Sequence, residues 1–158
     1  MDHKLSTTPE SLSRRKFIVA TSAIAVFGIP NTAVRADQTQ VDQAIAMLIE
    51  QDKPTTGDMI HLELPQIAEN GNTVPIKVSV DSPMTAQDYV KAVHIFAEKN
   101  PVAEVVTFHF TPASGKASAS TRMRLAKTQN VVALVQMSNG SAYTAKKQVK
   151  VTIGGCGG

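Results

Sequence analysis

The chain has 158 residues, of which 42% are hydrophobic and 4% aromatic, and it contains no tryptophan. This length and composition predict a single globular domain. The net charge of +3 comes from residues 1–36, which carry five basic and two acidic side chains; the rest of the chain holds 11 of each sign. A neutral domain argues against a nucleic-acid-binding face and against an acidic tail.

Residues 1–36 have the marks of a twin-arginine signal peptide. Arg14 and Arg15 end a polar segment, and the apolar run 17–29 follows. That run is too short to span a bilayer comfortably, so we expect no stable membrane insertion. Small residues at and before Ala36 predict cleavage after it. The alternative is a buried N-terminal helix, but we expect a periplasmic protein exported by the twin-arginine pathway.

Residues 37–53 are expected to form a short N-terminal helix. Apolar residues recur at helical spacing from Val41 to Ile49, and Pro54 follows as a helix breaker. This is the one helical pattern that we recognise after the leader.

Residues 54–153 change to a hydrophobic period of two, which is typical of strands. Asn139-Gly140 is a hairpin signal, and Pro75 indicates the start or the edge of a strand. Short strands with frequent turns and no intervening helix predict an all-β, immunoglobulin-like β-sandwich. The expected strands are 59–64, 74–80, 90–97, 104–110, 117–125, 130–137 and 142–153.

The histidines do not form a recognisable motif. His61, His94 and His109 fall on three different predicted strands, and a metal cluster or a catalytic base would need them to converge. Alternating strand positions more often hold surface histidines or hydrogen-bonded core histidines. We therefore expect no metal site, and the sequence contains no cofactor motif.

The last five residues, 154–158, read Gly-Gly-Cys-Gly-Gly and contain the only cysteine. Glycine leaves the backbone free, and a chain end without side chains has little to bury, so we predict a flexible arm. Cys156 cannot form an internal disulfide in an oxidising compartment. No Lys, Arg or His lies within five residues of it, so a protein that receives the arm should activate the thiol.

These features favour a carrier over an enzyme. Cys156 would be the point of covalent attachment, and the glycines would let the arm enter narrow clefts. The glycines are Gly154, Gly155, Gly157 and Gly158.

Two other functions remain open. One is a ubiquitin-like carrier that uses the carboxylate of Gly158, although its ATP-dependent adenylation does not suit an exported protein. The other is a structural protein tethered through Cys156 by an intermolecular disulfide.

The C-terminal motif and four internal segments together resemble one known family. The segments are PQIAENG (65–71), SPMT (82–85), HIFAEKNP (94–101), STRMRLA (120–126) and VKVTIGGCGG (149–158). They resemble SoxY, the sulfur-carrier subunit of the periplasmic thiosulfate-oxidising system, over essentially the whole chain after the leader.

The resemblance implies a sandwich subunit that pairs with a SoxZ-like β-sandwich subunit. It implies that Cys156 holds thiosulfate-derived sulfur during oxidation to sulfate, with no other cofactor. The c-type cytochrome SoxAX would join thiosulfate to the cysteine, and the hydrolase SoxB would release sulfate and leave a persulfide. The sequence leaves open whether the sulfur dehydrogenase SoxCD acts as well, and which reduced sulfur compound is preferred.

Overall fold

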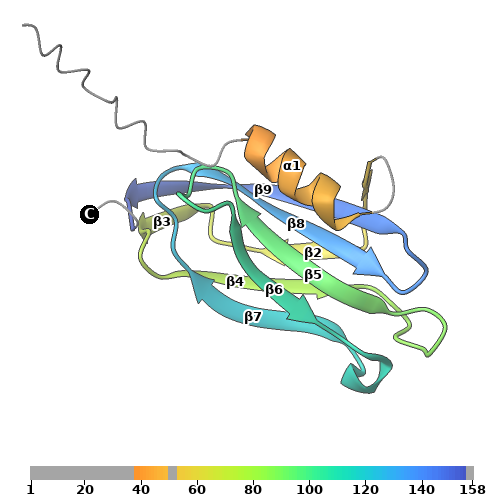
Figure 1. The fold of residues 1–158 in the computed structure, drawn as a ribbon. Coiled ribbons are helices and arrows are strands. Elements are labelled where there is room, and N and C mark those ends of the chain that lie inside the picture. Colours follow the sequence, from red (N-terminus) through yellow and green to blue (C-terminus); the bar gives the residue numbers. More distant parts are fainter. Residues whose placement is uncertain (1–37, 50–52, 156–158) are drawn as a thin grey trace, which may run out of the picture. The chain divides into compact units, whose positions relative to one another are not determined.

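The computed structural model describes residues 38–49 and 53–155, which fold into strands and one outer helix (Figure 1). All the predicted strands are present within two residues of the expected bounds. The elements are α1 (Gln38–Leu48), β1 (Thr55–Thr56), β2 (Ile60–Glu63), β3 (Ile67–Asn70), β4 (Val74–Val80), β5 (Val90–Ala97), β6 (Glu104–His109), the 3-10 turn η2 (Pro112–Ser114), β7 (Ala117–Met123), β8 (Gln129–Met137) and β9 (Ala142–Ile153).

The strands form two sheets that pack face to face. The large sheet has the order β1-β9-β8-β5-β6, with β3 also paired to β9, and the small sheet has the order β2-β4-β7. The prediction of an all-β, immunoglobulin-like sandwich with a short N-terminal helix is confirmed. Pro75 lies at the start of β4, as expected. Pairing of β2 with β4 begins at Lys77, so Pro75 has no partner on that side, and on the other side it faces Arg122 of β7.

Two short strands that we did not predict, β1 and β3, cover the edge of β9. β1 pairs in parallel with the start of β9, where Thr55 faces Tyr143, and β3 pairs with its end, where Ala68 faces Val151. β2 crosses to the small sheet between them. An unpaired strand edge would expose its backbone groups, so these two short strands protect the start and the end of this edge of β9.

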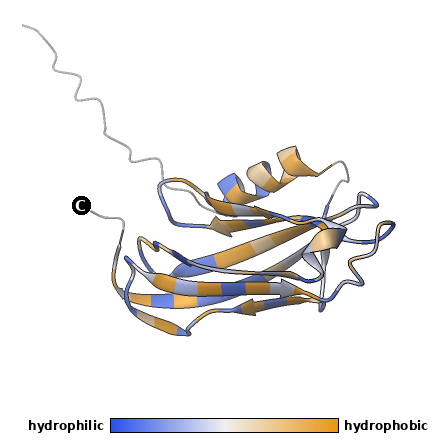
Figure 2. Cartoon of the chain, turned by 90° about the horizontal axis from the view of Figure 1, so that it is seen from below, coloured by the Kyte–Doolittle hydropathy of each residue, from blue (hydrophilic) through white to orange (hydrophobic). Residues whose placement is uncertain are grey.

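Alternation of residue types builds the core between the sheets, and Figure 2 shows the alternating hydrophobic and hydrophilic bands along the strands. On β4, Ile76 and Val78 are buried whereas Lys77 is exposed. β5 is different, because nearly every residue in it is buried. Its inner face packs into the sandwich, and its outer face lies beneath α1.

α1 packs its apolar side on the outer face of the large sheet. The buried residues Val41 and Ile45 contact a second hydrophobic cluster, to which the sheet contributes Phe96, Val132 and Leu134. The predicted helix covered residues 37–53, but the helix observed ends at Leu48. Residues 37 and 50–52 lie outside the described residues.

Polar contacts fasten both ends of this helix. At its start, the Lys146 ammonium donates to Gln38 Oε1 at 3.2 Å and lies 3.5 Å from the buried Glu98 Oε1. Glu98 Oε1 has no hydrogen-bond partner, so the ion pair with Lys146 offsets the cost of burying its charge. At the other end, the Gln136 amide donates to the Leu48 carbonyl.

Within residues 38–49 and 53–155, no helix has the length and apolar character needed to cross a membrane.

The packing of α1 gives a direct test on one helix. Ile45→Ala should lower the free energy of unfolding by about 2 to 4 kcal/mol, because it removes buried methyl groups and leaves a cavity. Met47→Ala is the matched control, since Met47 is 85% exposed and should shift stability by less than about 0.5 kcal/mol. Denaturant titration measures the stability of both variants. Equal losses of stability would contradict the burial of Ile45 against the large sheet.

Candidate functional site

Most of the predicted site residues lie outside the described part of the chain, so their roles remain predictions. They are Cys156, Gly157, Gly158, Arg14, Arg15 and Ala36. The described chain reaches Gly155. The candidate site is therefore the root of the C-terminal arm, where the chain leaves β9.

β9 brings the arm to one end of the sandwich and is held there on both sides. Its Val151 amide donates to Thr128 Oγ1 at 3.0 Å, and on the other edge Val151 pairs with Ala68 of β3. Figure 1 shows the end of β9 beside β3, at the end where β7 turns into β8. Three segments that are distant in sequence therefore meet at the root of the arm.

Three backbone hydrogen bonds link these segments in a relay. The Gly71 amide donates to the Ile153 carbonyl at 2.7 Å, and the Leu125 amide donates to the Gly71 carbonyl at 2.8 Å. The Gly155 amide then donates to the Leu125 carbonyl at 2.9 Å. We call this set of Gly71, Leu125, Ile153 and Gly155 the arm clasp.

The glycines of this region have no space for a side chain. A Cβ on Gly71 would lie 2.3 Å from the Leu125 carbonyl oxygen, and a Cβ on Gly154 would lie 2.1 Å from the Ala126 carbonyl oxygen. A Cβ on Gly155 would lie 2.2 Å from the Gly71 carbonyl carbon. The neighbours are backbone atoms, which cannot rotate away as a flexible side chain could.

This geometry adds to the sequence interpretation of two glycines. We expected Gly154 and Gly155 to be glycine because the arm is flexible from residue 154 onward. The structure gives a further reason, because both residues lie against the neighbouring loops at distances that only glycine permits. The flexibility of the arm and its entry into clefts stay predictions, and residues 156–158 lie outside the described part of the chain.

A buried amide pair supports the clasp from beneath. Asn100 is 7% exposed and Gln129 is 1% exposed. The Asn100 side chain donates to the Arg124 carbonyl at 2.9 Å and accepts from the Ala126 amide at 3.0 Å. It thus binds the residues on both sides of Leu125, whose own amide and carbonyl face the glycines. Gln129 donates to Asn100 Oδ1 at 2.9 Å and completes the pair.

The loops around the clasp carry more positive than negative charge. Arg124 adjoins Leu125, Lys127 follows two residues later, and the Lys99 amide binds the Gln129 side chain at 2.6 Å. Glu69, on β3, contributes an opposing charge. Exposed charges of this kind attract anions weakly, and salt screens them.

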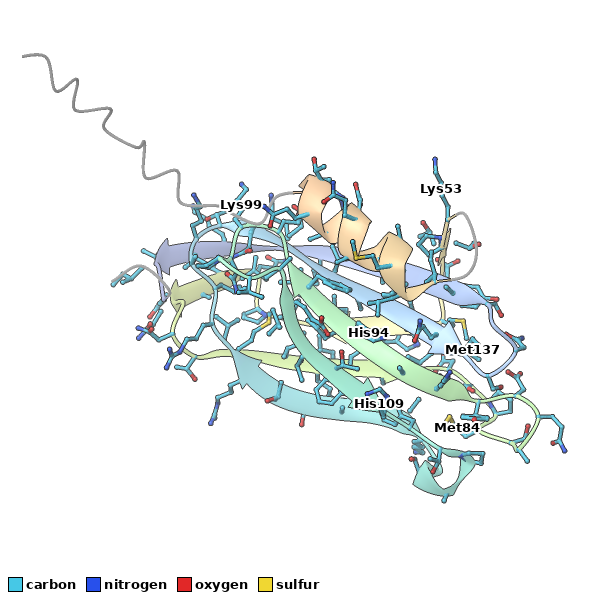
Figure 3. All side chains as sticks on the ribbon, in the orientation of Figure 1. Lys53, Met84, His94, Lys99, His109 and Met137 are labelled. Atoms are coloured by element: carbon cyan, nitrogen blue, oxygen red, sulfur yellow. The ribbon has the colours of Figure 1, made fainter. Side chains whose placement is uncertain are left out.

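The structure does not bring the histidines into a metal site. His61 binds the Asp81 carboxylate at 2.7 Å on the surface, and His109 is exposed on β6. His94 is buried on β5 (Figure 3), where its ring nitrogens lie 2.8 Å from Thr107 Oγ1 and 3.2 Å from Gln136 Oε1. Among the described residues, no group of three His, Cys, Asp or Glu is placed to hold a metal ion.

Among the residues that the structure describes, one carboxyl group has a clearly shifted pKa, and it belongs to the small sheet. The Lys77 ammonium donates to Glu63 Oε1 at 2.8 Å and holds the pKa of the Glu63 carboxyl below its usual value. Any stability from this exposed pair is present above the unfolded-state pKa of Glu63. It is lost as the pH falls through the lowered folded-state pKa. Surface pairs of this kind contribute little.

The fold and the clasp define an immunoglobulin-like domain that anchors a glycine-rich terminal segment. Residues 45–156 match the family described as sulfur oxidation protein SoxY. The solved sulfur carrier protein SoxY from Chlorobium limicola f thiosulfatophilum is 36% identical, with a TM-score of 0.62, and the match covers 73% of this chain and 98% of that one. The chain belongs to the SoxY family.

More distant structures share only the fold. A superoxide reductase (neelaredoxin) from Ignicoccus hospitalis is 18% identical, with a TM-score of 0.52, covering 59% of this chain and 80% of that one. The superoxide reductase from Nanoarchaeum equitans is 12% identical, with a TM-score of 0.52, and the match covers 61% of this chain and 100% of that one. No curated protein matches the sequence.

Sequence reasoning missed the residues that build the clasp. Gly71 entered the sequence analysis only as the last residue of the family-like segment 65–71, and no role was assigned to Asn100, Leu125 or Gln129. A usable signal was present, because three of these four residues lie within the segments that carry the family resemblance. The resemblance marked the segments but gave no reason for their contact.

The amide pair beneath the clasp can be tested by stability. Asn100→Leu should lower the free energy of unfolding by about 3 kcal/mol, because the Ala126 amide and the Arg124 carbonyl would lose a buried partner. Gln148→Ala, at an exposed position on β9, is the control and should change it by less than about 0.5 kcal/mol. Thermal and denaturant unfolding measure the difference. An Asn100→Leu variant as stable as the wild-type protein would show that the amide pair does not stabilise the clasp.

Proposed function

We propose that this protein is a periplasmic sulfur carrier that holds thiosulfate-derived sulfur covalently on Cys156. The arm clasp is the observation that carries the proposal. It holds the backbone of Gly155 by a hydrogen bond, and the next residue in the sequence is Cys156, the only cysteine. An anchor of this kind suits a thiol that is presented to other proteins. Membership of the SoxY family supports the same function.

The proposed loading step forms one sulfur–sulfur bond and releases two electrons. The Cys156 thiolate and thiosulfate join to give protein–S–S–SO₃⁻, and the two electrons pass to the haems of the SoxAX cytochrome. Hydrolysis by SoxB then consumes one water, releases sulfate with two protons and leaves a persulfide. SoxCD would oxidise that persulfide in a system that contains it. The carrier itself supplies the attachment point and not the catalysis.

The partners belong to the proposal as well. A SoxZ-like subunit would pair with this chain, and SoxAX, SoxB and SoxCD would dock transiently at the arm. The cations Lys99, Arg124 and Lys127 around the clasp favour an anionic adduct at this end of the domain. Native mass spectrometry of the purified carrier tests the stable pairing, and an unpaired chain that is fully loaded would contradict it.

Cys156→Ser separates carrying from folding. The variant should keep its free energy of unfolding within about 0.5 kcal/mol, the usual range for surface changes. With thiosulfate and the partner enzymes, sulfate production should disappear. Intact mass spectrometry should show thiosulfate and persulfide adducts on wild-type Cys156 and none on the serine variant.

Other adducts would contradict this function. A thiocarboxylate on Gly158 would indicate the ubiquitin-like carrier, and a stable intermolecular disulfide at Cys156 would indicate the tether. Turnover by Cys156→Ser would overturn the carrier role.

Export depends on the paired arginines in the proposed signal. Replacing Arg14 and Arg15 with lysine should leave the uncleaved precursor in the cytoplasm, because the twin-arginine signal would be lost. Lys4→Arg is the control, since it keeps the charge and lies outside the pair. Fractionation and immunoblotting measure the outcome. Normal periplasmic accumulation of the double variant would show that another route exports the chain.

A further inference from the structure

We propose that Gly71 is a positioning residue for sulfur transfer. It closes the arm clasp and thereby fixes the place where the chain leaves the domain toward Cys156. This inference rests on the proposed carrier function, but the clasp itself can be tested without it.

Gly71 is the central member of the relay. Its amide binds the Ile153 carbonyl, at the end of β9, and its carbonyl binds the Leu125 amide. The Leu125 carbonyl returns to the Gly155 amide, so Gly71 is bonded to the strand before the arm and to the loop that holds the arm. Gly71 is also buried, so water does not compete readily for these hydrogen bonds.

Only glycine fits at this position. A Cβ there would lie 2.3 Å from the Leu125 carbonyl oxygen and 2.7 Å from the Gly155 amide nitrogen, the two atoms that form the last bond of the relay. The smallest side chain would therefore separate the loop from the arm. Gly140, in the β8–β9 hairpin, differs because a Cβ added to it would meet no atom within 4 Å.

The clasp limits how far the sulfur can move. Cys156 follows Gly155 directly, and consecutive Cα atoms are about 3.8 Å apart. While the Gly155 amide stays bonded, the sulfur-bearing residue begins one peptide unit from a fixed point. Without the clasp, the free segment would begin at the end of β9. A partner enzyme would then have to restrict more backbone torsions in each encounter.

The test compares Gly71→Ala with Gly140→Ala in the exported protein, purified with any bound partner subunit. Gly140 has a φ of +87°, so alanine there is strained and destabilises the protein without touching the clasp. Gly155→Ala is a second variant, in case Gly71→Ala does not fold. Its Cβ would lie 2.3 Å from the Asn72 amide nitrogen.

Amide hydrogen exchange, followed by NMR, reports on the clasp directly. In the wild-type protein the Gly155 amide should exchange at least about tenfold more slowly than an unprotected glycine amide. Gly71→Ala should abolish that protection, whereas Gly140→Ala should keep it. An unprotected Gly155 amide in the wild-type protein, or protection that survives Gly71→Ala, would overturn the clasp.

Thiosulfate loading by the cytochrome reports on positioning. Gly71→Ala and Gly155→Ala should raise the KM for the carrier by about tenfold and change kcat by less than about twofold, because the arm is less pre-organised before binding. Reaction of the thiol with a small aromatic disulfide should stay within about twofold of wild type. Gly140→Ala should retain the wild-type KM.

The outcomes separate the two proposals. If the wild-type protein accepts no thiosulfate, the carrier function fails, whatever the hydrogen exchange shows. If it accepts thiosulfate and both clasp variants keep the wild-type KM, the carrier function stands and the positioning role of Gly71 is overturned.

Discussion

Close approach of three backbone segments is the constraint on which this end of the molecule depends. Gly71, Leu125 and Gly155 can exchange hydrogen bonds only because no side chain separates them. Backbone amides and carbonyls that are buried need partners. Each amide in the relay donates to a carbonyl of a neighbouring segment. The three hydrogen bonds therefore satisfy these buried groups and join the arm to the sandwich.

The remainder of the fold places these segments at the required distance. β3 lies along the end of β9 and carries Gly71 to it, while Asn100 and Gln129 hold the loop on either side of Leu125. α1 does not take part, since it covers the outer face of β5, β8 and β9. The sandwich thus separates two tasks: its core supplies stability, and its loops at one end fix the arm.

The sequence predicted the features that depend on local pattern. Period-two alternation located the long strands, and helical spacing located α1. β3 was missed because its pattern does not alternate in the usual way and its pairing with β9 joins residues about eighty positions apart. The clasp was missed because glycine has two uses that look the same in a sequence, freedom of the backbone and absence of a Cβ. The structure shows that the absence of a Cβ is required at Gly155.

The family-like segments acquire a physical meaning from this geometry. Segments 65–71, 94–101, 120–126 and 149–158 contribute Gly71, Asn100, Leu125 and Gly155, which meet at one end of the sandwich. Their contact gives these segments a shared structural role, which is to hold the backbone at the root of the arm. If partner enzymes supply the reactivity, the carrier's own contribution is the location of its thiol. A root fixed at Gly155 leaves fewer freely rotating backbone bonds before the cysteine than a chain that is free from Gly154 onward would.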